Sequence, residues 1–293
     1  MNTLRVAVTG TTGRVGAALA KGFASQHQVI ELPRQAFDLA DPAGMARVLE
    51  RLDCDVFLNP AGLTGLEDCL ENPALARRLN AEAPGEIAAW AARKGVRLIH
   101  FSTDYVFGGR EPGLRHEPDP VAPLNDYGRS KQAGGQAVLA HPNTCVMRIS
   151  WVFGPEKPSF VDGILHSALQ HEPLAAVADK FSLPTFTRDL TDWVLALARS
   201  EATGIFHACN SGEPASWHDL AEAVVDHLVR SGRLEARPPV ARQLLDEVPR
   251  FRATRPRHTA LATGRLTALL GNPPRPWRDA LADYLDTPPA PSN

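Results

Sequence analysis

Three glycines, Gly10, Gly13 and Gly16, stand between an apolar run and a helical pattern near the start of the chain. Leu4–Thr9 is apolar enough to be a strand buried on both faces, and a helix is expected from about Arg14. A glycine turn in this place lets backbone N–H groups and the helix N-terminus reach a pyrophosphate, and a third glycine lets the helix pack closely on the strand. The feature therefore predicts a dinucleotide-binding α/β fold, and a glycine-rich turn without a ligand is the alternative.

Strand-like runs and helical patterns alternate through the first half of the chain. Strands that alternate with helices build a parallel sheet covered on both faces. The fold class expected is therefore α/β, a Rossmann-like doubly wound parallel sheet. The further strands are expected at Val29–Leu32, Val56–Asn59, Val96–Ser102 and Cys145–Ile149, and a helix is expected from about Ala81 to Lys94, capped by Gly95.

The alternation weakens after about Phe153. Ser216 and Asp219 form a capping pattern ahead of an amphipathic stripe, which predicts a helix in a second unit. The proline-rich stretch from Gly108 to Asn125 has no periodic pattern, and we expect a loop that borders the active site. We expect a dinucleotide-binding domain of residues 1–153 plus roughly 178–210, a smaller, mostly helical substrate-binding domain of residues 154–177 and 211–286, and a disordered tail at 287–293.

Composition and charge exclude several classes of protein. The 293 residues carry a formal net charge of −2, with acids and bases mixed, so nucleic acid is not an expected partner. No apolar run approaches the ~18 residues of a membrane helix, and the first ten residues do not form a signal peptide, so we expect no membrane partner and a cytoplasmic location. The four cysteines show no C-x-x-C spacing, which indicates buried thiols in a reducing compartment, and no metal-ligand set is expected.

Several segments at predicted strand ends are candidates for cofactor binding. Arg34 follows the second strand, where an NAD-specific site places an acid against the ribose 2′-hydroxyl; a cation there suits a 2′-phosphate, so NADPH is expected, with NADH also open. The alternatives are a solvated arginine, a helix N-cap at Asp38 or Asp41, and a tight turn at 59–62. The expected cofactor-binding residues are Gly10, Thr12, Gly13, Arg14, Val15, Arg34, Asp38, Leu39, Asn59, Pro60, Ala61, Gly62, Ser102, Tyr127 and Lys131.

Two further motifs carry groups for carbonyl chemistry. Ser102 and Thr103 end the fourth predicted strand, where hydroxyls point into the ligand crevice of such sheets and can hydrogen-bond a substrate carbonyl. Tyr127 and Lys131 are four residues apart on a predicted helix and so share one face. A nearby ammonium stabilises a phenolate and lowers the tyrosine pKa from its usual ~10, so that Tyr127 can act as a general acid to a carbonyl oxygen. Thr103, Tyr127 and Lys131 are the expected catalytic residues.

These motifs together resemble the extended short-chain dehydrogenase/reductase family, whose glycine spacing is the G-x-x-G-x-x-G of this chain. Within it, the resemblance is to the dTDP-4-dehydrorhamnose reductases, because S-T-D-Y-V-F stands at 102–107, Y-G-x-[ST]-K at 127–131 and R-x-S-W-V at 148–152. Later motifs continue the resemblance, which runs from about residue 4 to 284, at Pro184–Thr185, Gly204–His207 and Arg255–Pro256.

The resemblance implies that a nicotinamide cofactor delivers hydride to the C4 ketone of a dTDP-4-keto-6-deoxy sugar, the nucleotide-sugar substrate. It implies that Tyr127 protonates the new alkoxide, that Lys131 holds the nicotinamide ribose and tunes Tyr127, and that Thr103 hydrogen-bonds the ketone oxygen. The C-terminal unit is then expected to bind the nucleotide, and a homodimer stays open. The expected substrate-binding residues are Thr64, Asp104, Tyr105, Trp151 and, for the diphosphate, Arg255.

Some positions depart from the family pattern. The family's N-A-A-A-[HY]-T-x-V-D becomes N-P-A-G-L-T-G-L-E at 59–67, so that Leu63 replaces a polar aromatic residue. The D-Q pair after the sixth strand becomes Asp179–Lys180. These departures spare the catalytic set and leave the identity of the sugar open.

Three other functions compete with simple reduction. The related 4,6-dehydratases have Thr-Asp-Glu where this chain has Thr103-Asp104-Tyr105, so the second carboxylate needed to eliminate water is missing. A nucleotide-sugar epimerase on the same fold stays open. So does a non-catalytic nucleotide-binding subunit similar to the regulatory β subunit of methionine adenosyltransferase, because a fold does not fix a function.

Overall fold

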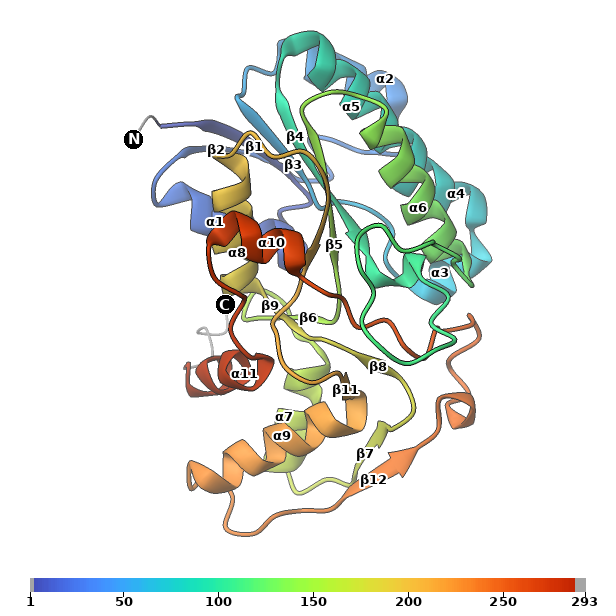
Figure 1. Ribbon diagram of the computed structural model, residues 1–293, viewed down its shortest axis with the longest axis vertical. Helices are drawn as coiled ribbons and strands as arrows, with labels where there is room; N and C mark the ends of the chain where they lie inside the picture. Colours follow the sequence, from blue (N-terminus) through green and yellow to red (C-terminus); the bar gives the residue numbers. More distant parts are fainter. Residues whose placement is uncertain (1–2, 288–293) are drawn as a thin grey trace.

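The computed structural model describes residues 3–287, and at its centre lies a parallel sheet of six strands (Figure 1). The strands follow the order β10-β5-β4-β3-β1-β2, with a topological switch point between β1 and β3, where the chain reverses its direction of travel across the sheet. The expected doubly wound sheet is confirmed, and each of the five predicted strands ends within one residue of its predicted limits. The strands are β1 (Arg5–Thr9), β2 (Gln28–Leu32), β3 (Val56–Asn59), β4 (Arg97–Thr103), β5 (Thr144–Ile149) and β10 (Gly204–Ala208).

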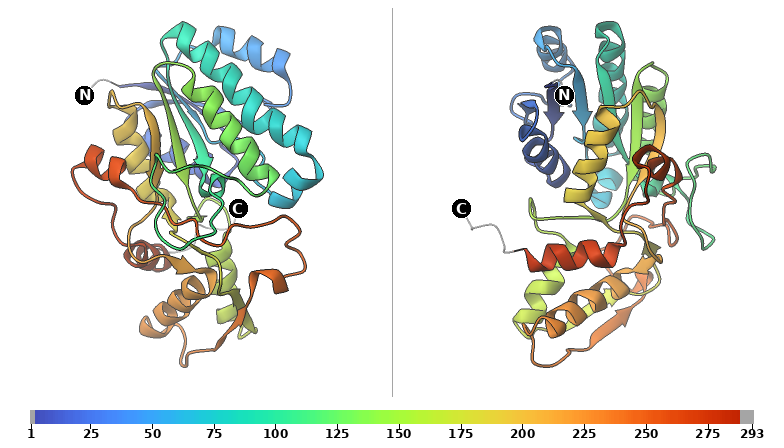
Figure 2. Two further views of the ribbon diagram at one scale, coloured as in Figure 1. Left: turned by 45° about the vertical axis from the view of Figure 1, so that its right-hand side comes forward. Right: turned by 60° about the vertical axis from the view of Figure 1, so that its left-hand side comes forward.

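Helices cover both faces of the sheet, and the side chains of β1 alternate between the two faces. Val6 and Val8 pack into one core, whereas Ala7 packs into the other. This two-residue alternation between two buried faces is typical of the central strand of a parallel sheet. The first face is covered by α1 (Arg14–Ala24), α8 (Thr187–Ala198) and α10 (Gly264–Leu270), and the second by α2 (Pro42–Arg51), α5 (Ala83–Lys94) and α6 (Asp126–Leu139) (Figure 1 and Figure 2).

The helix that ends at Lys94 begins earlier than the predicted start at Ala81. Pro84 has no N–H to donate to the carbonyl of Asn80, and a proline ring crowds that carbonyl in a regular α-helix. A wider π-helical turn lies at this place, which lets the helix continue through the proline. The C-terminal cap is as predicted, since Gly95 has a left-handed φ of 71°. The elements in this region are α3 (Leu66–Glu71), α4 (Pro73–Arg77), the π turn (Arg78–Glu82) and α5.

A second, smaller and mostly helical unit lies below the sheet in the view of Figure 1. Ile164, Val224 and Trp277 from three of its helices share one core. Ser216 and Asp219 form the reciprocal capping box that the sequence predicts at the start of α9. The larger elements are α7 (Phe160–Leu169), β7 (Leu174–Val177), α9 (Trp217–Arg230), β12 (Val240–Gln243) and α11 (Trp277–Asp286). Short pairs join the units, β6 (Val152–Phe153) with β9 (Thr185–Phe186) and β8 (Phe181–Ser182) with β11 (Ala215–Ser216), and single 3-10 turns lie at Asp104–Val106 and Leu245–Glu247.

The C-terminal segment contributes to both units, which corrects one part of the expected domain division. The sequence pattern assigns residues 211–286 to the substrate domain, but Leu266 of α10 is fully buried in a core of the sheet, beside β10 and α8. An amphipathic helix shows in sequence that one face is buried, and not against which core it packs. The rest of the division stays a proposal. Of the tail expected to be disordered at 287–293, residues 288–293 lie outside the described part of the chain.

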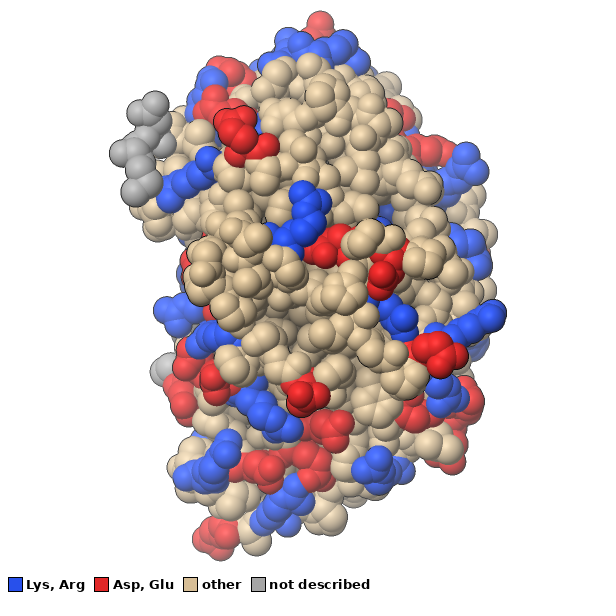
Figure 3. Space-filling model, viewed as in Figure 1, with Lys and Arg blue, Asp and Glu red and all other residues tan. Residues whose placement is uncertain are grey.

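Basic and acidic side chains are interspersed on the face of the molecule shown in Figure 3. On this face, therefore, no large patch of one sign is present that would attract a polyanion. No helix within residues 3–287 has the length and apolar character needed to cross a membrane.

Candidate functional site

A cavity of about 670 Å³, here called the cofactor cavity, lies against the carboxyl ends of β1, β4 and β5 and the turn that follows β3. In open α/β sheets this edge, at the switch point, is where ligands bind. All but two of the predicted site residues lie on its wall, and the exceptions are Asn59 and Arg255. Those on the wall are Gly10, Thr12, Gly13, Arg14, Val15, Arg34, Asp38, Leu39, Pro60, Ala61, Gly62, Thr64, Ser102, Thr103, Asp104, Tyr105, Tyr127, Lys131 and Trp151.

The glycine turn presents backbone at one end of the cofactor cavity. Gly10 has a left-handed φ of 61°, and a Cβ at Gly16 would lie 2.2 Å from the carbonyl oxygen of Gly10. Gly13 N donates to that same oxygen at 2.9 Å. The chain can turn this tightly only because these positions lack side chains. The turn and the N-terminus of α1 therefore form a cradle that fits a dinucleotide pyrophosphate.

Arg34 and Asp38 lie together on the wall of the cofactor cavity, in the segment after β2. The Arg34 side chain is 76% exposed, and its Nε lies 3.7 Å from the Asp38 carboxylate. Asp41 is the N-cap of α2 and accepts from Gly44 N at 3.0 Å, so the capping interpretation holds for Asp41. An exposed pair at this distance is weak, so the Arg34 guanidinium is free to turn toward a phosphate.

Arg14 is bonded to the protein chain itself. Its guanidinium donates to the backbone carbonyls of Val152 (3.1 Å), Lys157 (3.1 Å) and Pro158 (2.6 Å). These bonds fix the first turn of α1 to the segment that leads into the second unit. Lys157 also lines the cofactor cavity and is a cation that sequence reasoning missed, because it belongs to no motif.

Asn59 lies behind the cavity wall, which corrects its expected contact with the cofactor. Its side chain is fully buried, Oδ1 accepts from Thr9 Oγ1 (2.8 Å), and Nδ2 lies 3.2 Å from His100 Nδ1. Thr9 Oγ1 in turn accepts from Ala61 N at 3.2 Å. The Asn59 amide therefore connects β1, β3 and β4 beneath the turn at 60–62, and so supports the wall from the protein side.

The helix that carries Tyr127 is fixed at its start by Asn125. Asn125 Oδ1 accepts from Gly128 N (2.7 Å) as an N-cap, and its Nδ2 donates to Thr254 O (2.7 Å) in the C-terminal segment. Tyr127 and Lys131, one turn apart, then both face the cofactor cavity. The predicted pair therefore meets the cavity that the glycine turn also lines.

Burial controls the protonation of both groups, which corrects the expected electrostatics. Burial raises the pKa of Tyr127 above its usual value, and a hydrogen bond with Thr103 only partly opposes this. Burial also lowers the pKa of Lys131 to about 8. Removal from water disfavours the phenolate and the ammonium alike, and the lysine is not among the groups that shift the pKa of Tyr127. Tyr127 therefore keeps its proton at neutral pH, as a general acid must.

Asn80, in the π turn, is a candidate site residue that sequence reasoning missed. Its Oδ1 accepts from Leu63 N (2.9 Å), and its Nδ2 donates to Leu63 O (2.8 Å) and to Ser130 Oγ (3.0 Å). A Cβ at Gly62 would lie 2.5 Å from Asn80 Oδ1 and 3.7 Å from Lys131 Nζ. Asn80 thus fixes the loop beside Lys131. The signal in the sequence was Pro84, because a proline inside a predicted helix favours a wider π turn just before it, and π turns are frequent at functional sites.

The carboxylate of Asp104 is occupied by protein hydroxyls, although the residue contributes to the cavity wall. It accepts from Thr103 Oγ1 (3.0 Å), Ser182 Oγ (3.2 Å) and Thr259 Oγ1, and the side chain is buried. The expected contact between Asp104 and the sugar stays a proposal, because Asp104 lines the cofactor cavity. Asp104 also connects the end of β4 to two segments of the C-terminal half.

Tyr105 and Trp151 form an aromatic part of the wall. The Tyr105 ring meets the Tyr127 ring edge-on, with centroids 5.8 Å apart. Trp151 has a positive φ of 42°, and its Nε1 is buried without a hydrogen-bond partner among the described residues. A strained residue with an orphaned donor in a cavity wall suits a ligand that brings an acceptor.

Trp151 also lines a second cavity of about 680 Å³, which we call the aromatic cleft. Trp217 contacts three other rings of the cleft, with centroids 5.6 Å from Trp151, 6.0 Å from Phe160 and 5.6 Å from Phe251. Arg14, Trp151 and Val152 belong to both cavities, so the aromatic cleft adjoins the cofactor cavity. A planar base fits such a set of rings.

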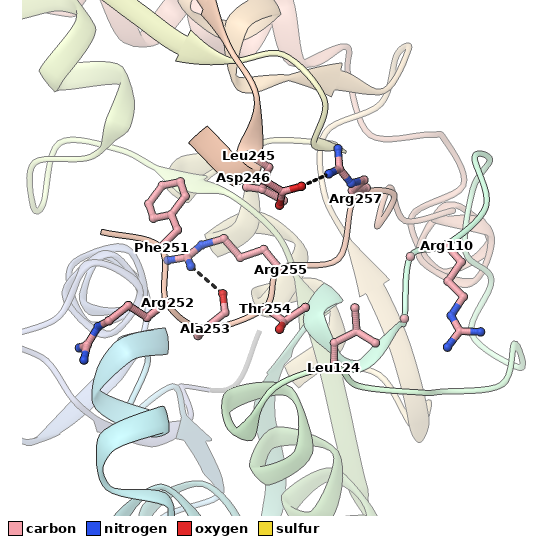
Figure 4. Close-up of a pocket in the computed structure, with 12 residues that line it drawn as sticks. Arg110, Leu124, Leu245, Asp246, Phe251, Arg252, Ala253, Thr254, Arg255 and Arg257 are labelled. Atoms are coloured by element: carbon pink, nitrogen blue, oxygen red, sulfur yellow. Dashed lines mark hydrogen bonds and ion pairs between the residues drawn. The ribbon is translucent and has the colours of Figure 1, made fainter. Parts of the chain in front are cut away.

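Arg255 faces a third cavity, of about 460 Å³ (Figure 4). Its Nη2 pairs with both Glu67 oxygens (2.9 and 3.1 Å), and its guanidinium lies 3.8 Å from the Phe251 ring centroid. Its Nη1 donates to Ala253 O at 2.9 Å, the bond drawn in Figure 4. Arg255 is thus bound to the protein, which corrects its expected availability for a diphosphate. The sequence could not show Glu67 as its partner, because the two residues are 188 positions apart.

The loop at 108–125 borders this third cavity, whereas we expected it to border the active site. Arg115 N donates to Ala260 O, and Ala262 N donates to Arg115 O, both at 2.8 Å, so the loop lies along the C-terminal segment. Gly108, Gly109, Arg110 and Leu124 line the third cavity, and no residue of this loop lines the cofactor cavity.

The remaining wall residues of the cofactor cavity are mostly apolar and carried no sequence signal beyond their hydrophobicity. From the sequence alone, apolar residues of this kind are expected to belong to the hydrophobic core. They include Phe37, Leu63, Leu66, Leu79, Phe101, Ile149, Ser150 and Val152.

Comparison with known proteins places this geometry in context. A family model described as "RmlD substrate binding domain" matches residues 4–288. A protein of Mycobacterium tuberculosis named dTDP-4-dehydrorhamnose reductase is 36% identical over 97% of this chain and 93% of its own length. A protein of Streptomyces antibioticus named a probable dTDP-4,6-dihydroxy-2-methyloxan-3-one 4-ketoreductase is 34% identical over 96% of this chain and 94% of its own length. A crystal structure of dTDP-4-dehydrorhamnose reductase from Bacillus anthracis in complex with NADP superposes with a TM-score of 0.88 at 25% identity, over 97% of this chain and 99% of that one.

Proposed function

The chain belongs to the family described as the RmlD substrate binding domain, and on that premise we propose that it catalyses the NADPH-dependent reduction of the C4 ketone of a dTDP-4-keto-6-deoxy sugar. The named activities of the Mycobacterium and Streptomyces relatives support the reaction class, and the NADP bound to the Bacillus protein supports the cofactor. Because those relatives are named for different 4-keto sugars, the proposal commits to the dTDP carrier and the C4 ketone, with dTDP-4-dehydro-L-rhamnose as the first substrate to test.

One observation carries the proposal. The cavity that the glycine turn lines is also lined by Tyr127, Lys131 and Thr103. A proton donor therefore lies in the same cavity as the backbone that fits a dinucleotide pyrophosphate. A binding module needs the cradle, but it does not need a buried phenol and a buried ammonium one helical turn apart. Groups with strongly shifted pKa values in a cleft are typical of catalytic sites.

The protein groups act on the proton and on the position of the ketone. NADPH, when bound in the glycine cradle, supplies the hydride. Tyr127 holds a proton at its hydroxyl and gives it to the oxygen that becomes an alcohol. The Thr103 hydroxyl shares a hydrogen bond with the same phenol and so positions Tyr127 for this transfer. The Lys131 ammonium, which is present below a pH of about 8, lies on the wall of the same cavity and holds the nicotinamide ribose by hydrogen bonds.

The nucleotide is assigned to the aromatic cleft. Its rings offer a stacking surface to thymine, and Trp151, shared between the two cavities, lies between the proposed places of base and cofactor. The sugar is then assigned to the region of the cofactor cavity beside Tyr105 and Trp151. Thr64 also faces this cavity and stays a proposed sugar contact.

The experiment that tests the proposal follows NADPH oxidation at 340 nm with dTDP-4-dehydro-L-rhamnose and, in parallel, a UDP-linked 4-keto sugar. We expect turnover with the dTDP sugar and weak or no turnover with the UDP sugar. Tight NADPH binding without turnover on any 4-keto sugar would contradict the proposal and favour the non-catalytic subunit. Interconversion of sugar epimers without net NADPH consumption would favour an epimerase.

A further inference from the structure

Lys180 lies directly behind the aromatic wall of the site and has no accessible surface. It follows β7 and does not line the cofactor cavity. Its Nζ donates to Pro256 O at 2.8 Å, which uses one of the three donors of an ammonium group. A buried cation is unfavourable unless nearby groups compensate the loss of its hydration. The other groups around Lys180 must therefore stabilise its charge.

Two aromatic rings supply part of the compensation. Lys180 Nζ lies 4.7 Å from the ring centroid of Tyr105 and 5.7 Å from that of Trp151. Both distances are within the ~6 Å over which a cation is attracted by the face of an aromatic ring. Tyr105 and Trp151 are the residues that form the aromatic wall of the cofactor cavity, so one cation contacts both rings from the protein side.

Asp104 supplies the remaining compensation and links Lys180 to the reduction site. Burial raises the pKa of Asp104 and lowers that of Lys180, and each of the two groups opposes the shift in the other, because the charge of each favours the charged form of its neighbour, whereas the Arg255 cation disfavours the ammonium. An ionised carboxylate can only accept hydrogen bonds. With the carboxylate ionised, the Thr103 hydroxyl donates to Asp104 Oδ1 at 3.0 Å, and Thr103 Oγ1 accepts from Tyr105 N at 3.2 Å.

A neutral amide such as that of glutamine could donate to Pro256 O equally well. The hydrogen bond to Pro256 therefore does not require the positive charge of Lys180, whereas the contacts with the two rings and with Asp104 do. The charge acts on the two wall rings directly and is linked to Thr103 through Asp104.

We propose that Lys180 is a positioning residue of the site: its ammonium holds the rings of Tyr105 and Trp151 in place and, through Asp104, sets the direction of the Thr103 hydroxyl. The part of this inference that concerns turnover rests on the proposed reductase function. The part that concerns the placement of Trp151 does not.

The test compares Lys180→Gln with the unchanged protein, with Lys94→Gln, which alters an exposed lysine, as the matched control. Glutamine can still donate to Pro256 O, so the variant is expected to fold. We expect the KM for the nucleotide sugar to rise about 10-fold, as for the loss of cation–π contacts in a dry site, while the dissociation constant for NADPH changes less than about twofold. General destabilisation would weaken the binding of both ligands, so a rise in the KM for the sugar alone indicates an effect on the sugar site.

A spectroscopic measurement keeps the two proposals separable. Lys180→Gln should change the tryptophan emission spectrum, and the change should vanish when both proteins also carry Trp151→Phe. An unchanged KM together with an unchanged spectrum would overturn the inference. So would failure of Lys180→Gln and Lys180→Met to fold, because Lys180 would then serve the fold and not the site. If the unchanged protein reduces no 4-keto sugar, the proposed function fails, and the emission measurement still decides the role of Lys180.

Discussion

At the scale of single residues, burial determines the protonation of Tyr127 and Lys131 more than any pair of charges does. It keeps a proton on Tyr127 and makes the proton of Lys131 easier to lose, with a pKa of about 8. Below that pH, a neutral phenol and an ammonium face the same cavity. The neutral phenol can protonate an alkoxide, and the ammonium can hold a hydroxyl-bearing part of the cofactor beside it.

Tyr127→Phe removes the proton donor and leaves the ring in place. We expect kcat to fall at least ~100-fold, the low end for the loss of a general acid, with NADPH affinity unchanged. Steady-state kinetics and fluorescence titration with NADPH measure the two effects. Tyr284→Phe, which removes a phenol hydroxyl bonded to Asp162 outside the cofactor cavity, is the control and should retain turnover. Turnover of Tyr127→Phe close to that of the unchanged protein would exclude Tyr127 as the acid.

The pH profile should report Lys131. Its buried pKa of about 8 means that the ammonium is present below pH ~8 and is lost as the pH rises through that value. We therefore expect kcat/KM for NADPH, which reports groups of the free enzyme, to decline above pH ~8. In Lys131→Arg the charge persists to higher pH, so this decline should disappear from the measurable range. Because the pKa of Lys180 is also about 8, Lys180→Gln is the second control, and the decline should persist in it.

Arg34→Ala tests the choice of cofactor. If the guanidinium contacts a 2′-phosphate, the KM for NADPH should rise about 10-fold or more, since a charge-assisted contact to phosphate contributes ~1.5–3 kcal/mol, whereas the KM for NADH stays nearly constant. Arg47→Ala, on α2, removes another exposed arginine and should affect neither. Equal increases for both cofactors would show that Arg34 does not distinguish them.

At the scale of elements, the glycine turn and α1 depend on missing side chains. A methyl group at Gly16 would collide with the Gly10 carbonyl, which α1 approaches as it leaves the turn. The helix could avoid the collision only by moving away from β1, and its N-terminus would then leave the pyrophosphate position.

Gly16→Ala should therefore weaken NADPH binding at least ~10-fold, or prevent folding, although alanine is the better helix former by up to ~1 kcal/mol. Gly163→Ala in α7 is the matched control, because a Cβ there meets nothing within 4 Å, and it should be neutral or slightly stabilising. Thermal unfolding with and without NADPH measures both variants. A Gly16→Ala protein with normal NADPH affinity would contradict the close approach.

Elements with a periodic pattern could be predicted from sequence, and the contacts between them could not. The strand limits and the Ser216 cap follow from local chemistry, and both are confirmed. The packing of α10 on the sheet and the pairing of Arg255 with Glu67 join distant segments, which no local pattern encodes. The site divides in the same way, since the motifs supplied most of the wall of the cofactor cavity, whereas Asn80 and Lys157 lie outside any motif.

The two units meet at the site at the scale of the whole molecule. Arg14 donates to β6 and to the segment after it, Asn125 donates to Thr254 of the C-terminal segment, and Trp151 lines both the cofactor cavity and the aromatic cleft. A cofactor assigned to one unit and a nucleotide assigned to the other would therefore meet across a shared wall. This arrangement suits transfer between two bound molecules, and the central claim is that such a transfer, a hydride to a sugar C4, takes place.

The most direct test uses NADPH deuterated at C4 of the nicotinamide, on each face in turn, with dTDP-4-dehydro-L-rhamnose as the acceptor. The product is analysed by mass spectrometry and NMR. We predict one deuterium at C4 of the sugar from one of the two labelled cofactors, and loss of this product in Tyr127→Phe. A product without deuterium from either cofactor, or no product from a protein that binds both ligands, would contradict the reductase account.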